Sequence, residues 1–283
     1  MLDLKFIRQN RELVEQGVAN KRVKIDFNRL LELDEKRRGL LEGSENLKAE
    51  RNKANMEIAN AKKQGGPGKE LIDRMKEVAG RVKELDAELS EVEQELDAML
   101  LTIPNLPHET TPVGASEDDN VVLRSWGEKP ELSWQPKPHW DVAESLGLAD
   151  FATATKLSGS GFILFTGAGA LLERALISWM LDVHVTEHGY TEVSPPFIVN
   201  RDCMTGAGQL PKMEEDMYLC SVDDLFLIPT AEVPVTNIHR EQILDGSKLP
   251  IRYAAYTPCF RREAGSYGKD TRGMIRVHQF DKV

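Results

Sequence analysis

Residues 259–283 read CFRREAGSYGKDTRGMIRVHQFDKV and hold the most informative pattern of this chain. We predict that Phe260 to Glu263 close one β-strand and that Gly265 to Gly273 form a loop rich in glycine and charge. Apolar and polar residues alternate from Met274 to Phe280, which predicts a second strand. The stretch is therefore predicted to be a β-hairpin whose arginines face one ligand.

Four side chains of this hairpin have the chemistry of a nucleotide site. Arg261 and Arg276 are permanently charged, planar donors that suit phosphate oxygens. Glu263 can accept a hydrogen bond from the amino group of a base, and Phe280 can stack on that base. An isolated Arg-x-Glu triplet is more often an ordinary charged surface strand, so the nucleotide interpretation depends on the longer string.

That longer string, FRREAGSYGKDTRG followed by RVHQF, resembles motif 2 of class II aminoacyl-tRNA synthetases, and in particular the seryl-tRNA synthetase version. The resemblance implies that Arg261 bridges the substrate carboxylate and the α-phosphate of ATP, while Arg276 holds the distal phosphates. Glu263 would meet the adenine amino group, and Mg²⁺ is expected between the phosphates, with no protein metal ligands assigned. The implied catalytic residues are Arg261, Glu263 and Arg276. The implied ATP-binding residues are Arg261, Arg262, Glu263, Arg276, Val277, His278, Gln279 and Phe280.

A second motif lies at residues 228–237, IPTAEVPVTN. Its composition predicts a strand that leads into a helix, with Thr230 as the N-cap and Glu232 as a first-turn acid that offsets the helix dipole. The segment also resembles the TAE motif of the seryl enzymes. The resemblance implies that Thr230, Ala231, Glu232 and Arg261 bind L-serine, and that Glu232 pairs with its ammonium group.

The N-terminal part of the chain predicts an antiparallel coiled-coil hairpin over about residues 30–100. Apolar residues at alternating spacings of four and three form a strong seam in its second half, and a weaker seam, diluted by Arg37, Ser44 and Arg51, continues through its first half. Residues 64–68, QGGPG, break the two helices apart. The strong seam comprises Leu71, Met75, Val78, Val82, Leu85, Leu89, Val92, Leu96 and Met99.

The charge of the arm is uneven. The chain carries a formal net charge of −10, which argues against a generally basic nucleic-acid binder. Residues 48–76 nevertheless contain eight Lys or Arg against four acids, whereas residues 84–97 contain seven acids and no base. A helical arm alone is more often a spacer or a dimerisation device, but the family resemblance implies contact with the long variable arm of tRNA(Ser). The predicted tRNA-binding residues are Lys48, Arg51, Lys53, Lys62 and Lys63.

A proline-rich connector after the arm predicts two domains: a tRNA-binding helical arm at 1–103 and a partial class II catalytic domain at 104–283. The expected fold is α+β, with an antiparallel β-sheet and flanking helices after the coiled coil. The apolar helix at 171–188 and a strand at 190–200, interrupted by Pro195 and Pro196, resemble motif 1, which implies a homodimer. His139, beside Trp140, is interpreted as a packing or capping residue.

Composition agrees with a cytoplasmic protein: 41% of the 283 residues are hydrophobic and 29% are charged, and neither a membrane span nor a leader is predicted. Three scattered cysteines, Cys203, Cys220 and Cys259, indicate neither a disulfide framework nor a zinc site.

The resemblance implies a serine-tRNA ligase: ATP activates L-serine as seryl-adenylate, and the seryl group passes to tRNA(Ser), with tRNA(Sec) as a second candidate. Motif 3 of the family would fall beyond Val283, so the sequence is expected to be truncated and inactive alone. The alternatives are a non-catalytic paralogue that acts as an RNA-binding module, a coiled-coil interaction protein, and a relative that activates another amino acid.

Overall fold

The computed structural model describes residues 2–62, 69–262 and 273–283, with the side chains of 59–62 and 69–72 left out. The chain divides into two compact units, Met1–Gly127 and Glu128–Val283. The predicted domain boundary after residue 103 falls just past the last helix of the first unit, and the connector up to Gly127 belongs to that unit.

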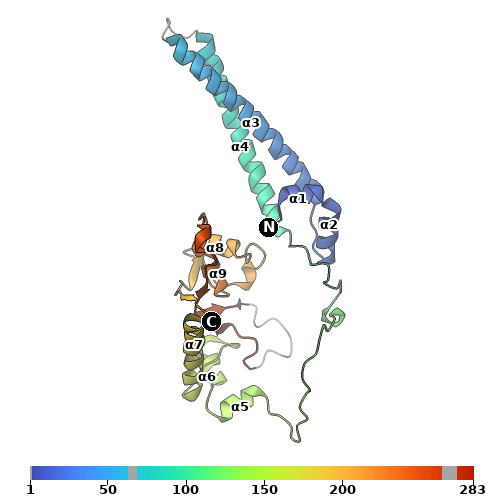
Figure 1. Cartoon of the computed structure of the whole chain (residues 1–283), viewed down its shortest axis with the longest axis vertical. Coiled ribbons are helices and arrows are strands. Elements are labelled where there is room, and N and C mark those ends of the chain that lie inside the picture. Colours follow the sequence, from blue (N-terminus) through green and yellow to red (C-terminus); the bar gives the residue numbers. More distant parts are fainter. Residues whose placement is uncertain (1, 63–68, 263–272) are drawn as a thin grey trace. The chain divides into compact units, whose positions relative to one another are not determined.

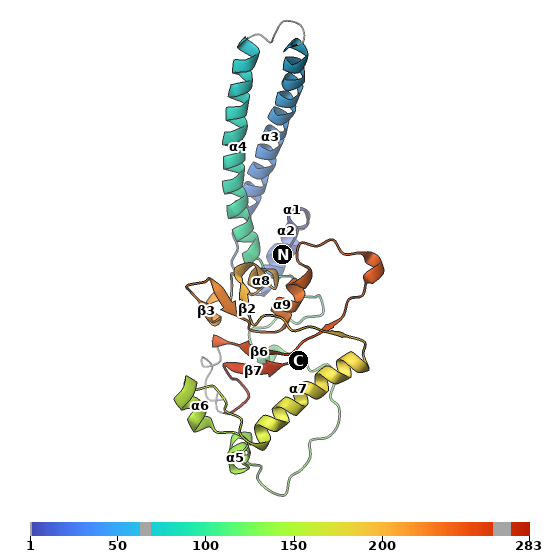
Figure 2. The same cartoon turned by 90° about the vertical axis from the view of Figure 1, so that its left-hand side faces the viewer.

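The first unit is built on a long helical hairpin of α3 (Phe27–Lys62) and α4 (Lys69–Thr102), which run side by side (Figures 1 and 2). Two short helices, α1 (Leu4–Gln9) and α2 (Arg11–Asn20), pack against its base, and η1 (Glu117–Asp119) lies in the connector. The predicted coiled-coil hairpin is therefore confirmed. Its basal core consists of Ile7, Val14, Val18, Phe27, Leu30, Leu33, Val92, Leu96, Leu100 and Ile103.

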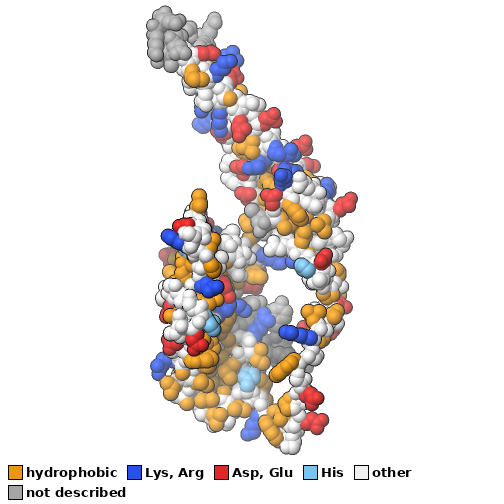
Figure 3. Space-filling model, in the orientation of Figure 1, with side chains coloured by type: hydrophobic (Ala, Val, Ile, Leu, Met, Phe, Trp, Pro, Cys, Tyr) orange, Lys and Arg blue, Asp and Glu red, His pale blue; other side chains and the backbone are white. Residues whose placement is uncertain are grey.

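Ion pairs between the two long helices fix their antiparallel alignment. Arg29 bonds to Glu95, Lys36 to Glu88 and Lys48 to Asp86, each at 2.8 Å, so the partner on α4 comes earlier in the sequence as the residue on α3 comes later. Red and blue side chains accordingly alternate along the arm (Figure 3). The acidic run on α4 thus serves as the counter-charge of α3, which the sequence pattern had not revealed.

The second unit carries the helices α5 (His139–Ser145), α6 (Phe151–Ser158), α7 (Ala168–Thr186), α8 (Arg201–Gly206) and α9 (Glu232–Thr236), with short 3₁₀ turns η2 (Glu214–Asp216), η3 (Asn237–His239) and η4 (Gly246–Lys248). Its strands are β1 (Thr191–Glu192), β2 (Ile198–Asn200), β3 (Leu219–Cys220), β4 (Leu225–Leu227), β5 (Tyr253–Ala254), β6 (Thr257–Phe260) and β7 (Gln279–Lys282).

These strands form three small sheets. The order β2-β4-β3 is antiparallel throughout, β6 pairs with β7 in antiparallel fashion, and β1 pairs with β5 in parallel. The predicted α+β class is confirmed, with one short parallel pair added. As predicted, Pro195 and Pro196 interrupt the strand that follows α7, because proline has no N–H to give to the ladder. Behind β2 and β4 lies a core of Val199, Met204, Leu210, Met217, Phe226, Ile228 and Val233.

The predicted strand limits in the last hairpin were wrong. The first strand ends at Phe260, earlier than expected, and the second begins at Gln279, whereas residues 273–276 form bends rather than a strand. The reason lies in the hydrogen bonds of Arg261, whose N–H still reaches the His278 carbonyl while its own carbonyl is bonded to the His278 ring. A side chain therefore replaces the ladder where the strands would continue.

Candidate active site

The β6–β7 hairpin holds Arg261 against a neighbouring segment of chain. Phe260 lies opposite Gln279, and the next pair beyond the ladder is Arg261 with His278. The Arg261 guanidinium carbon lies 4.9 Å from the centre of the Phe280 ring, a cation–π contact. Its Nε donates to the Pro229 carbonyl at 3.3 Å. Arg261 therefore joins the hairpin to the residue that precedes Thr230.

The 228–232 segment runs from β4 into α9 along β6. The N–H of Phe260 donates to the Ile228 carbonyl at 2.8 Å, which ties the segment to the hairpin. The prediction that Thr230 caps the helix was wrong, because Ala231 occupies the N-cap position and no side chain caps there. Instead the Thr230 hydroxyl donates to the Glu232 carboxylate. Glu232 lies in the first turn of α9, as predicted.

Lys282 completes a three-residue polar cluster that the sequence did not predict. Its ammonium lies 2.6 Å from Glu232 Oε1 and 2.8 Å from the Thr230 hydroxyl oxygen. Burial by itself would raise the pKa of Glu232, but the hydrogen bonds from Lys282 and Thr230 outweigh it and lower that pKa to about 2. Strand pairing was the missing signal, since β7 brings Lys282 opposite Thr257 and so beside α9.

Glu232 and Lys282 of this cluster line a cavity of about 220 Å³, together with Ala231, His184 and Tyr190. Glu232 is thus already bound to an alkylammonium group, the same chemical group that an amino acid presents. Its geometry suits the predicted role of an ammonium acceptor.

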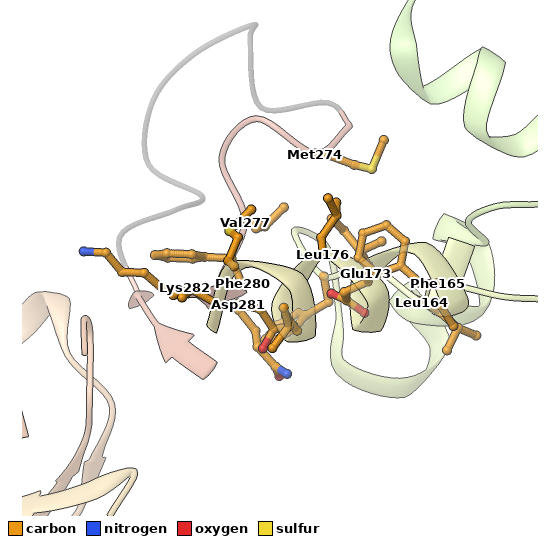
Figure 4. Close-up of a pocket in the computed structure, with 16 residues that line it drawn as sticks. Leu164, Phe165, Glu173, Leu176, Met274, Val277, Phe280, Asp281 and Lys282 are labelled. Carbon is orange, nitrogen blue, oxygen red and sulfur yellow. The ribbon is translucent and has the colours of Figure 1, made fainter. Parts of the chain in front are cut away.

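A larger pocket, about 530 Å³, lies between α7 and β7 (Figure 4). Three of the predicted ATP residues, Val277, Gln279 and Phe280, line it. Glu173 of α7 lies beside Asp281, and burial, with the hydrogen bond and charge of Asp281, raises the pKa of Glu173 to about 7. The pocket therefore combines an apolar wall with two carboxyl groups, Glu173 and Asp281, that are hydrogen-bonded to each other.

A tyrosine completes this acidic group. The Tyr256 hydroxyl donates to Asp281 at 2.7 Å, and burial together with Asp281 raises the Tyr256 pKa to about 12. Asp281 therefore remains hydrogen-bonded from one side whatever the protonation state of Glu173.

The remaining predicted site residues lie in different surroundings. Val277 is buried, His278 and Arg276 are half-buried, and Arg262 is exposed. The structure brings Arg261, Phe280 and the 230–232 segment together. Glu263, predicted to contact adenine, lies outside the described residues, so that prediction stays open.

Comparisons with known proteins place this geometry in a family. The family model for the seryl-tRNA synthetase N-terminal domain matches residues 1–107, and that for the tRNA synthetase class II core domain (G, H, P, S and T) matches residues 218–283. The serine–tRNA ligase of Trichlorobacter lovleyi is 60% identical over all 283 residues, which span 67% of that relative's length. The chain belongs to the seryl-tRNA synthetase family.

Two further comparisons agree with the family assignment. The serine–tRNA ligase of Bacillus subtilis is 54% identical over 284 aligned residues, and the chain spans 67% of its length. The crystal structure of the seryl-tRNA synthetase from Pyrococcus horikoshii complexed with ATP matches this chain with a TM-score of 0.82 and 40% sequence identity. The match covers 100% of this chain and 68% of the Pyrococcus horikoshii chain. The recognition of a class II aminoacyl-tRNA synthetase, a ligase, is confirmed.

In this seryl-tRNA synthetase family member, the predicted tRNA-binding cations of the arm are not equivalent. Lys48 is half-buried and bonds to Asp86 at 2.8 Å, and the buried Ser44 hydroxyl donates to the same carboxylate at 2.7 Å. Hydrogen bonds from Lys48 and Ser44, with the charge of Arg51, lower the Asp86 pKa. Lys53 is exposed, whereas the Lys62 side chain and Lys63 lie outside the described residues.

The described part of the chain contains no group of three or more His, Cys, Asp or Glu side chains placed to hold a metal ion. None of its helices is both long enough and apolar enough to cross a membrane.

Proposed function

We propose that this chain supplies the ATP and L-serine sites of a serine–tRNA ligase, where β6, β7 and the 228–232 segment meet. The complete enzyme activates serine as seryl-adenylate and transfers the seryl group to tRNA(Ser). One observation carries the proposal. Arg261, the implied link between carboxylate and α-phosphate, stacks on Phe280 and bonds to Pro229, beside the Thr230–Glu232 cluster. The implied nucleotide and amino-acid sites are therefore adjacent, as a reaction between the two ligands requires.

The first step needs no side-chain nucleophile. A serine carboxylate oxygen attacks the α-phosphorus of ATP, the bond from that phosphorus to the oxygen bridging the β-phosphorus breaks, and pyrophosphate leaves. Glu232 holds the serine ammonium, and Arg261 offsets the charge on the reacting carboxylate and phosphate. Arg276 holds the distal phosphates and Glu263 the adenine amino group. Rate enhancement comes from positioning and charge stabilisation.

In the second step a hydroxyl of the terminal tRNA ribose attacks the seryl carbonyl, and AMP leaves. We expect Mg²⁺ to lie between the ATP phosphates. We expect the reaction to take place in the cytoplasm.

The arm is proposed to contact the long variable arm of tRNA(Ser). Exposed Lys53 supports this role most directly, because an exposed cation is free to displace counterions from phosphates. Arg51 is half-buried, and its charge also acts on Asp86. The affinity of this chain for tRNA(Ser) tests the role of the arm. tRNA(Sec) is the second RNA to be measured, and a tRNA with a short variable arm is the control.

We also propose that the chain forms a homodimer through α7. Six large apolar side chains of this helix are between 37% and 62% exposed. Exposed apolar side chains gathered on one element are typical of a protein–protein interface. They are Leu171, Leu172, Leu176, Trp179, Met180 and Val185. A second copy of the chain would cover them, and light scattering of the purified protein tests this directly.

The decisive experiment is amino-acid-dependent exchange of pyrophosphate into ATP, run with all twenty amino acids. It compares this chain with a chimera in which residues 1–283 are followed by the remainder of the Trichlorobacter lovleyi relative. We expect exchange with serine in the chimera, and a loss of about a hundredfold or more in Arg261→Ala. Arg252→Ala, an exposed arginine outside the site, is the matched control. Exchange with a different amino acid, or none, would contradict the proposal.

A further inference from the structure

His139, at the start of α5, is bonded to a backbone group 135 positions later in the chain. The N–H of Met274 donates to His139 Nε2 at 2.8 Å. Because a backbone N–H is only a donor, this ring nitrogen carries no proton. Gly273 has φ of +93°, and a Cβ at that position would lie 2.3 Å from the same nitrogen. The ring therefore packs closely on the backbone at 273–274 and fixes it by one hydrogen bond.

His278 fixes the backbone of Arg261 by the opposite chemistry. Its Nδ1 lies 2.9 Å from the Arg261 carbonyl oxygen, and because that oxygen only accepts, Nδ1 must carry the proton. The Arg261 N–H returns a bond to the His278 carbonyl at 2.8 Å. The ring stacks on Phe162 with centroids 5.2 Å apart, and the His278 N–H bonds to the Gly161 carbonyl. Arg261 is thus held at both of its backbone groups.

The two histidines hold the two ends of the short segment that carries Arg276. Met274 stands two residues before Arg276 and His278 two residues after it, and Figure 4 shows Met274 and Val277 on this segment. The same His278 that anchors the segment's end also fixes the other arginine. An imidazole ring is therefore bonded to the backbone at Arg261 and another at Met274, two residues before Arg276.

We propose that His139 and His278 are positioning residues for ATP, which act by fixing the backbone at Met274 and Arg261 and so align Arg276 with Arg261. The inference rests on the proposed ATP site, and it assigns His278 a role through Arg261 rather than through contact with the nucleotide. Neither histidine takes part in a bond-making step.

The opposite requirements of the two rings give a crossed test. An asparagine amide reaches about as far as imidazole Nδ1, and a glutamine amide about as far as Nε2. His139→Gln can keep an acceptor for Met274, whereas His139→Asn cannot reach it. His278→Asn can keep a donor for Arg261, whereas His278→Gln places its donor elsewhere.

The measurement is the affinity of this chain for ATP by isothermal titration calorimetry, with Arg261→Ala as the reference loss and thermal unfolding as a check on folding. We expect His139→Asn and His278→Gln to weaken ATP binding about three- to tenfold, the effect of one lost hydrogen bond. His139→Gln and His278→Asn should stay within about twofold of the unsubstituted chain.

Equal losses for Asn and Gln at either position would overturn the inference, because they would indicate packing alone. No loss in any of the four variants would overturn it as well. Failure of the proposed function looks different: the unsubstituted chain would bind no ATP, or Arg261→Ala would bind it unchanged.

Discussion

The α3–α4 hairpin and the β6–β7 hairpin both reverse the chain, but different interactions specify them. In the helical hairpin the contacts repeat along the sequence, so that Val78, Val82 and Val92 are buried at the spacing that heptads require. In the β hairpin the decisive bonds connect distant residues, such as His139 with Met274 and Lys282 with Glu232. A repeated pattern is readable from the sequence alone, whereas a single long-range bond is not.

The largest expected effect tests the independence of the two regions. Leu96 is only 1% exposed in the basal core of the arm, so Leu96→Ala should destabilise the first unit by about 2–5 kcal/mol. Urea unfolding followed by circular dichroism measures the change, because the arm supplies the longest helices. Leu101→Ala, at a position that is 40% exposed, is the matched control and should change stability little.

The same variant asks whether the second unit needs the arm. We expect ATP affinity to stay unchanged in Leu96→Ala at temperatures where the arm is still folded. Weaker ATP binding there would show that the two regions are energetically coupled.

The second prediction concerns the ammonium acceptor. Glu232→Gln keeps the size of the side chain but removes its charge, and a hydrogen bond to a charged group is worth about 1.5–3 kcal/mol. Serine binding should weaken about ten- to a hundredfold, while ATP binding should be unaffected. Calorimetric titration with each ligand separates the two. A parallel loss of ATP affinity would indicate a damaged fold rather than a lost acceptor.

How far the sequence could predict this site follows from the same contrast. Arg261, Phe280 and the 230–232 segment were recognised because each belongs to a short motif with its own chemistry, and the structure brings them together. Lys282 was missed because its role depends on the register of β7 against β6. The strand limits at 274–280 were wrong because a His278 side-chain bond replaces a ladder bond that the alternation of residues had predicted.

The third prediction concerns Glu173, which lies beside Asp281 in the pocket between α7 and β7. Glu173 has a pKa raised from its ordinary 4.5 to about 7, so its ionisation opposes folding. The cost begins as pH rises above 4.5 and is complete above about 7. Glu173→Gln should therefore stabilise the chain at pH 8 by about 1 kcal/mol, after allowance for solvent screening, and should have no such effect at pH 4.

Thermal unfolding at the two pH values measures this difference. Glu187→Gln, an exposed position just after α7, provides the control and should show no pH-dependent gain. Equal stabilisation by Glu173→Gln at both pH values would mean that packing at this position, rather than the charge of Glu173, lowers the stability of the chain.

A smaller effect is expected from Lys282, which bonds to the Glu232 carboxylate that we assign to serine. Because two ammonium groups compete for Glu232, Lys282→Met should tighten serine binding about threefold, the smaller end of a hydrogen-bond contribution. The exposed Lys248→Met is the control. Weaker serine binding in Lys282→Met would show that Lys282 orients Glu232 instead of competing with its ligand.

The smallest predicted effect concerns two cations of the arm, Lys48 and Lys53. The Lys48 ammonium is held by Asp86 at 2.8 Å, whereas Lys53 is exposed. A cation that touches a phosphate contributes about one unit to the slope of log affinity against log salt concentration. Lys53→Ala should therefore lower the slope for tRNA(Ser) by about one unit, and Lys48→Ala by clearly less, with the exposed Lys5→Ala on α1 as the control. Equal slopes for Lys48→Ala and Lys53→Ala would mean that the RNA displaces Asp86 from Lys48, in which case a bond that stabilises the free arm is exchanged for one that holds the tRNA.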